Sequence, residues 1–152
     1  MRGFSHSLLL ALIAISPSAF AALGGNVESV TNSNNQAVVR AQVRTIPSNG
    51  YTVHESVTEA GVTVREYASQ QGVVFAVTWS GPSMPDLQQF LGGYFPQFHA
   101  AMAERRQRGV RGPVMLQQND LVVESRGHMR EFSGRAYAPN LLPPQVSIEE
   151  IQ

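Results

Sequence analysis

The chain has 152 residues, a formal net charge of zero, 43% hydrophobic residues, 14% charged residues and no cysteine. This length and hydrophobic fraction fit one folded domain, and a balanced charge gives no general attraction to nucleic acid phosphates. The lack of cysteine excludes disulfides, thiolate metal sites and cysteine nucleophiles, and the lack of lysine excludes Schiff-base chemistry.

The first 21 residues have the pattern of a secretory signal peptide. Arg2 supplies the positive charge, residues 8–15 form an apolar core, and residues 19–21 (Ala-Phe-Ala) fit a small-x-small cleavage site. A membrane-spanning helix needs about 20 apolar residues, and the Ser-Pro-Ser sequence at 16–18 interrupts the apolar core too early. We therefore expect cleavage after Ala21 or Ala22 and an exported protein, periplasmic or secreted, that has no membrane anchor after cleavage.

Composition divides the remaining chain into three parts. Residues 22–50 are rich in Asn, Ser and Gly and end in Pro-Ser-Asn-Gly, which predicts an N-terminal arm and linker. Residues 51–139 carry the periodic hydrophobic patterns of a single α+β domain. Residues 140–152 form a Pro-rich C-terminal tail, in which Ser147 and Glu150 have the spacing of a capping box.

Three strands are expected in the first half of the domain. Residues 51–57 and 62–67 alternate between apolar and polar side chains, and glycine-containing loops follow both segments. Residues 73–79 are apolar at most positions on both faces, which is typical of a central strand. We predict that these segments form an antiparallel meander.

Helical spacing of Leu and aromatic residues follows over residues 85–107. Gly92-Gly93 and Pro96 predict a bend between two helices, 85–91 and 94–107. Short strand patterns then recur in the segment 114–137. The predicted fold class is α+β: an antiparallel sheet of about five strands in the order β-β-β-α-β-β, with the bent helical segment packed on one face.

No pattern in the chain predicts a metal or a cofactor. His54, His99 and His128 are far apart and lack a metal-ligand spacing. No Gly-x-Ser-x-Gly sequence marks a nucleophilic serine. Acid–base chemistry would have to use Glu66, His54 or His128, and a hydrolase-like enzyme using these groups is the alternative functional hypothesis.

The candidate binding residues are Arg126, His128, Arg130 and Arg135, which lie close together in one segment. If residues 129–137 are extended, Arg130 shares a face with His128 and Phe132, and Arg135 points to the other face. Arginine binds carboxylates and phosphates with two parallel hydrogen bonds. The competing interpretation is that these arginines form internal ion pairs with Glu66, Glu124 or Glu131.

The leading functional hypothesis is therefore a non-catalytic envelope or secreted protein that binds a partner protein or a small anionic ligand. The enzyme hypothesis would require a concave pocket in which at least two of the acid–base groups converge. A surface that keeps these side chains apart would favour binding.

Three stretches, residues 64–67, residues 72–82 with 85–87, and residues 127–139, together resemble a family of exported proteobacterial proteins known as domain of unknown function 2844. The resemblance covers essentially the whole chain after the signal peptide, including Leu23-Gly24-Gly25. It implies a Gram-negative source and a small exported domain. It implies no activity, cofactor or catalytic residue.

Overall fold

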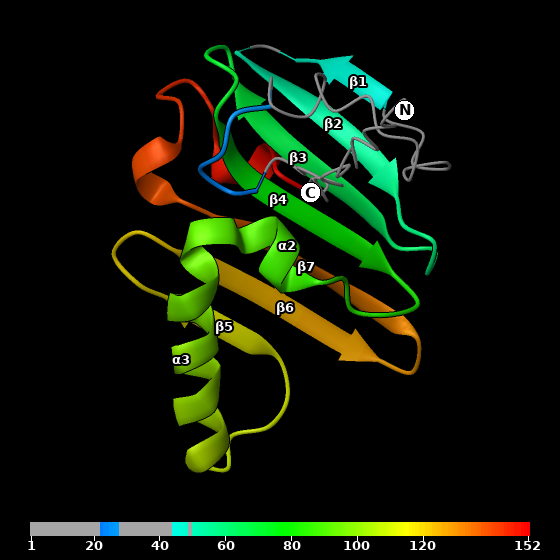
Figure 1. The fold of residues 1–152 in the computed structure, drawn as a ribbon, viewed down its shortest axis with the longest axis vertical. Coiled ribbons are helices and arrows are strands. Elements are labelled where there is room, and N and C mark those ends of the chain that lie inside the picture. The colour runs from blue at the N-terminus through cyan, green and yellow to red at the C-terminus, as the bar shows by residue number, and fades with distance from the viewer. Residues whose placement is uncertain (1–21, 28–43, 49) are drawn as a thin grey trace, which may run out of the picture.

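A seven-stranded antiparallel sheet is the centre of the computed structural model, which describes residues 22–27, 44–48 and 50–152. The strands are β1 (Arg44–Pro47), β2 (Tyr51–Val57), β3 (Thr63–Ser69), β4 (Val74–Gly81), β5 (Val114–Gln117), β6 (Val122–His128) and β7 (Glu131–Tyr137). Their order across the sheet is β1-β2-β3-β4-β7-β6-β5. The first four strands therefore meet the last three where β7 pairs with β4 (Figure 1).

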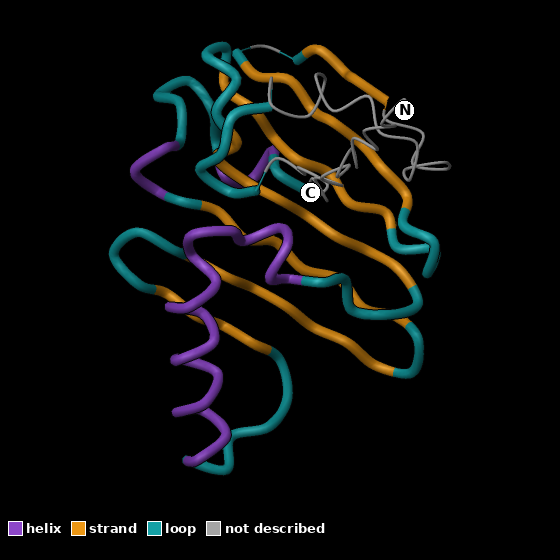
Figure 2. The backbone as a smooth tube through the Cα atoms, in the orientation of Figure 1, coloured by secondary structure: helices purple, strands orange, loops and turns teal. Residues whose placement is uncertain are grey.

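The predicted fold of about five strands in an α+β arrangement is wrong. In the described residues the order is β-β-β-β-α-β-β-β, and the fold is mostly β, with its longest helical stretch at residues 87–107 (Figure 2). One added strand, β1, lies in the segment predicted as an arm and pairs with β2. Four residues ending in Pro47 are too few to show a period, and proline is tolerated at such a sheet edge.

The β6–β7 hairpin explains the other miscount. Strand β6 continues to His128, which lies opposite Glu131 on β7. The chain reverses at Met129 and Arg130, whose φ angles are 43° and 70°. Two-residue turns with positive φ usually contain Asn and Gly, so no ordinary turn signal marks this position.

The helical segment also differs from the prediction that it packs on the sheet as a whole. Helix α2 (Leu87–Leu91) has three buried apolar side chains, whereas the described residues of α3 (Phe95–Gln107) include none and contact the core only through the partly buried Phe95 and Phe98. A 3₁₀ turn at Gly92–Tyr94 separates the two helices, and α3 extends past β5 (Figure 1). The side chain of Asp86 caps α2 by accepting a hydrogen bond from the Gln88 N–H at 3.0 Å.

The face of the sheet under α2 carries the larger core, which we call the helix face. Buried side chains from β3, β4, β6, β7 and α2 fill it, including Val64, Val77, Trp79, Leu91 and Val123. Residues 22–27 pack at the margin of this core: Leu23 is buried and its N–H donates to the Phe90 carbonyl at 2.8 Å. None of the helices in the described part of the chain is long and apolar enough to cross a membrane.

The opposite face, which we call the back face, is partly covered by the C-terminal segment 139–152. Val146 and the fully buried Ile151 pack with Tyr51, Tyr67 and Phe75 in a second core. Full burial of one such aliphatic side chain stabilises a fold by about 1.5–3 kcal/mol. The C-terminal segment is thus part of the packed structure.

Two parts of the sequence-based prediction lie outside the described residues. These are the signal peptide, residues 1–21, and residues 28–43 of the predicted arm.

Candidate functional site

The four predicted binding residues lie on the β6–β7 hairpin but do not form one cluster. Directly opposed residues share a face of the sheet and alternate residues on a strand do likewise. The register therefore places Arg126, His128 and Arg135 on the back face, whereas Arg130 lies in the turn. The turn breaks the extended stretch that would have placed Arg130 beside His128 and Phe132.

The hypothesis of internal ion pairs holds for only part of this group. Arg135 pairs with Glu124, with both Nε and Nη2 at 3.0 Å from Oε2. Arg126 is exposed and donates from Nε to the Ser133 hydroxyl at 3.3 Å. Arg130 is also exposed, and no ion pair to Arg126 or Arg130 is found within the residues that the structure describes.

Two of the three candidate acid–base residues, His54 and Glu66, are cross-strand neighbours, and the third, His128, lies apart from them. His54 lies directly opposite Glu66 on the helix face, whereas His128 lies on the back face at the far end of the sheet. Burial raises the pKa of the Glu66 carboxyl to about 7 and lowers the pKa of His54. Glu66 is only 9% exposed, and its Oε1 atom has no hydrogen-bond partner within the described residues. A carboxyl buried in this way is poorly placed to meet a substrate.

Residues from five strands form two polar rows across the back face. The first row, which we call the hydroxyl row, contains the cross-strand neighbours Thr63, Ser80, Ser133 and Arg126. The second, which we call the arginine row, contains Glu55, Arg65, Thr78, Arg135 and Glu124. The next row is mainly apolar, with Val53, Tyr67, Ala76, Tyr137 and Val122. The back face therefore changes from apolar to polar along the strands.

The arginine row brings Arg65 and Arg135 to either side of Thr78. Each guanidinium is held on its outer side by a carboxylate, because Arg65 Nε donates to Glu55 Oε2 at 2.7 Å and Arg135 binds Glu124. Since neighbouring strands lie about 4.8 Å apart, the two arginine backbones are separated by about 10 Å. The long arginine side chains can thus reach a shared ligand.

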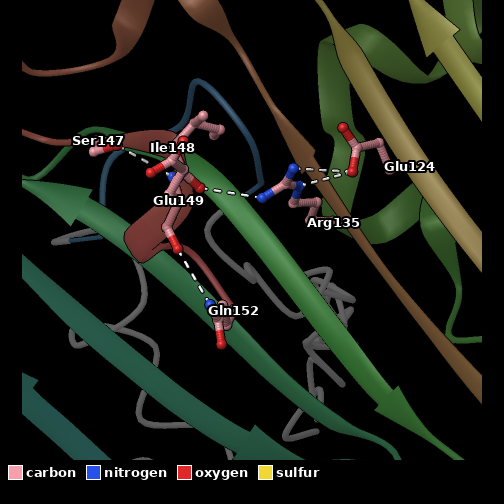
Figure 3. A network of polar contacts seen from close by, with 6 residues as sticks. All are labelled: Glu124, Arg135, Ser147, Ile148, Glu149 and Gln152. Carbon is pink, nitrogen blue, oxygen red and sulfur yellow. Dashed lines mark hydrogen bonds and ion pairs between the residues drawn. The ribbon is translucent and has the colours of Figure 1, made fainter.

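The C-terminal segment binds the same two arginines. Arg135 Nη1 donates to the Ile148 carbonyl at 3.1 Å, and Figure 3 shows Arg135 between this carbonyl and Glu124. Arg65 Nη1 donates to the main-chain oxygen of Gln152 at 3.2 Å. These hydrogen bonds orient both guanidinium groups over the sheet.

A groove of about 720 Å³ lies over the two polar rows, and its lining also includes Ile151 and Gln152. Its lining contains three arginines, Arg65, Arg126 and Arg135, and one carboxylate, Glu124. Glu124 is paired with Arg135 and Arg65 is paired with Glu55, so Arg126 is the lining arginine that has no ion pair within the described residues. The groove is suited to a ligand that supplies acceptor oxygens. It contains none of the three candidate acid–base residues.

Nothing in the described part of the chain forms a group of three or more acidic or histidine side chains that could hold a metal ion.

Sequence reasoning missed Arg65 and the hydroxyl residues of the groove. Their signal is a repeated spacing, since polar residues stand two positions apart on four strands: Thr63 and Arg65, Thr78 and Ser80, Glu124 and Arg126, and Ser133 and Arg135. In a strand this spacing places both residues on one face. Only the register shows that the four pairs lie side by side.

The comparisons with known proteins identify a family and nothing more specific. No curated protein and no solved structure matches the chain. Residues 19–151 match the family described as "Protein of unknown function (DUF2844)". The chain belongs to this family, as the resemblance in its sequence predicted.

Proposed function

We propose that the protein is an exported, non-catalytic binding protein that holds an anionic or carbonyl-bearing group in the groove of the back face. The group belongs to an envelope or secreted partner or to a small anionic ligand. The observation that carries this proposal is the position of Arg65 and Arg135 on either side of Thr78, inside a groove that a third arginine, Arg126, also lines. The N-terminal signal pattern supports export.

The four binding residues predicted from the sequence have different roles in this proposal. Arg135 and Arg126 line the groove. His128 lies on the same face, two residues after Arg126 on β6, and Arg130 lies in the turn that follows. We assign ligand contact to Arg65, Arg126 and Arg135, and we assign to His128 and Arg130 a contact with the outer part of a larger partner.

The test is an NMR titration that follows the arginine Nε–H signals of the full chain while inorganic phosphate or succinate is added. Binding in the groove shifts the signals of Arg65, Arg126 and Arg135 in a saturable manner. A hydrogen bond to a charged group contributes about 1.5–3 kcal/mol, so Arg126→Gln should weaken binding by about tenfold or more.

The matched control is Arg108→Gln, because Arg108 is exposed on the surface after α3 and pairs only with Glu104 among the described residues. This variant should bind as the unmodified protein does. Equal shifts at Arg108 and at the groove arginines, or no saturable shift, would contradict the proposal.

A further inference from the structure

The C-terminal segment is held on the back face in the way that a binding protein holds a peptide. Side chains donate hydrogen bonds to its main-chain oxygens: Arg135 to Ile148, and both Arg65 and Tyr67 to Gln152. The Tyr67 hydroxyl is 2.7 Å from the Gln152 oxygen. Main-chain recognition of this kind does not depend on the side chains of the bound segment, so the same donors suit other peptides.

The bound segment also has an apolar anchor. Ile151 is fully buried and Val146 is 5% exposed, and both pack on the aromatic rings of the apolar part of the back face. The segment thus combines an anchored side chain with main-chain hydrogen bonds, which is the usual division of labour in peptide recognition.

The groove includes residues of this segment in its lining. Ile151 and Gln152 line the groove together with the four residues of the hydroxyl row. The row crosses four strands, β3, β4, β7 and β6. At a strand spacing of about 4.8 Å it is about 14 Å long, which equals about four residues of extended chain at roughly 3.3 Å per residue.

Charge favours an acidic occupant. Arg126 is exposed, and within the described residues its one hydrogen bond is to the Ser133 hydroxyl. Arg65 and Arg135 keep N–H groups that their carboxylate and carbonyl partners do not use, because each guanidinium has five donors. A carboxylate beside these groups would complete their hydrogen bonding.

We infer that the groove binds an extended, acidic peptide segment of a partner protein, laid across the hydroxyl row beside the C-terminal segment. Its main-chain groups contact Thr63, Ser80 and Ser133, and an acidic side chain pairs with Arg126. This inference rests on the proposed function and specifies the class of ligand.

The experiment compares four probes by NMR titration of the full chain: succinate, a blocked hexapeptide of glycine, serine and two aspartates, the same peptide with asparagine for aspartate, and a sulfated disaccharide. The acidic peptide should bind with a Kd at least tenfold lower than succinate. Its binding should shift the amide signals of Thr63, Ser80 and Ser133 as well as those of Ile151 and Gln152.

Variants then test the acidic contact. Arg126→Gln should weaken binding of the acidic peptide by about tenfold and should leave the weaker binding of the asparagine peptide unchanged. Arg108→Gln should change the affinity for neither peptide. Because Arg126 is exposed, its replacement should leave the fold intact, and amide signals remote from the groove report whether it does.

The remaining outcomes separate the two proposals. If succinate binds as tightly as the acidic peptide, the groove is a small-anion site and the peptide inference is overturned, while the proposed function stands. If the sulfated disaccharide binds more tightly than the peptide, the ligand class is a sugar and the inference is again overturned. If no probe shifts the groove signals, both proposals fail.

Discussion

The indole ring of Trp79 lies directly over Gly134, which is its cross-strand neighbour on β7. A Cβ atom at position 134 would overlap with Cζ2 of Trp79 and with the carbonyl oxygen of Glu124. Glycine inside a strand costs about 0.5–1 kcal/mol relative to alanine. Here the loss is offset because the absent side chain lets the buried indole pack against the backbone where the two halves of the sheet meet.

Gly134→Ala should therefore destabilise the protein. Overpacking of a core costs about 1–3 kcal/mol, and urea denaturation should show a loss in this range in the free energy of unfolding. Gly93→Ala is the control, because a Cβ at Gly93 meets nothing within 4 Å. A Gly134→Ala protein as stable as the control would contradict the close packing of Trp79.

Glu66 should make stability fall as pH rises. Burial raises the pKa of this carboxyl from 4.5 to about 7, so between these values the folded state binds more protons than the unfolded state. The contribution is fully present below pH 4.5 and is lost as pH rises through 7. At 1.36 kcal/mol per pKa unit, the loss is about 3 kcal/mol.

Glu66→Gln should remove this dependence and should be more stable than the unmodified protein at pH 8. His54 lies on β2 opposite Glu66 and has a lowered pKa. Through His54 the protein loses stability as pH falls below 6.5, whereas through Glu66 it loses stability as pH rises. The difference between the two proteins across urea denaturation at pH 4 to 8 isolates the Glu66 contribution. If the unfolding free energies of the two proteins change with pH in parallel, ionisation of Glu66 does not destabilise the folded state, and the prediction is wrong.

The turn between β6 and β7 should be stabilised by glycine. Arg130 has a φ angle of 70°, and this left-handed conformation costs a non-glycine residue about 1–2 kcal/mol. Arg130→Gly should raise the free energy of unfolding by about 1 kcal/mol. Arg130→Ala keeps the strain and should leave stability nearly unchanged, since the exposed Arg130 has no ion pair within the described residues. A large loss in the alanine variant would instead indicate a structural ion pair.

Ile151 should contribute strongly to stability although it is near the C-terminal end of the described chain. Its side chain is fully buried in the core of the back face, and truncation of such residues to alanine costs about 2–5 kcal/mol. Ile151→Ala should lower the unfolding free energy accordingly, whereas Glu150→Ala, at an exposed neighbour, should not. Equal stability of the two variants would mean that the C-terminal segment is not held on the sheet in solution.

Export should produce a chain that begins at Ala22 or Leu23. Cleavage at either position retains the Leu23 nitrogen, which donates to the Phe90 carbonyl at 2.8 Å. Mass spectrometry of the protein from a periplasmic or culture-medium fraction measures the N-terminus directly. An uncleaved chain in the cytoplasmic fraction would remove the support for export.

Local pattern was a sound guide to individual strands in the first half of the sheet. The alternation over residues 51–57 and 62–67 predicted strands that the structure has as β2 and β3, and the apolar segment 73–79 predicted β4, which lies between β3 and β7 at the middle of the sheet. These predictions succeeded because alternation and two-sided apolarity follow from the burial of each strand alone. The strand count failed at β1, which is too short to show a period, and at the β6–β7 turn, where Met129 and Arg130 adopt a conformation that their residue types do not indicate.

The amino-acid sequence alone determines the family, the absence of cysteine and lysine chemistry, the positions of most strands, and a concentration of arginine near residue 130. These are properties of composition and of local spacing. The groove is different, because Arg65 lies 70 residues before Arg135 along the chain and the two meet across Thr78 only through the pairing of β3, β4 and β7. Strand register and the position of the C-terminal segment depend on which distant segments bury their apolar faces together, so only the tertiary structure decides them.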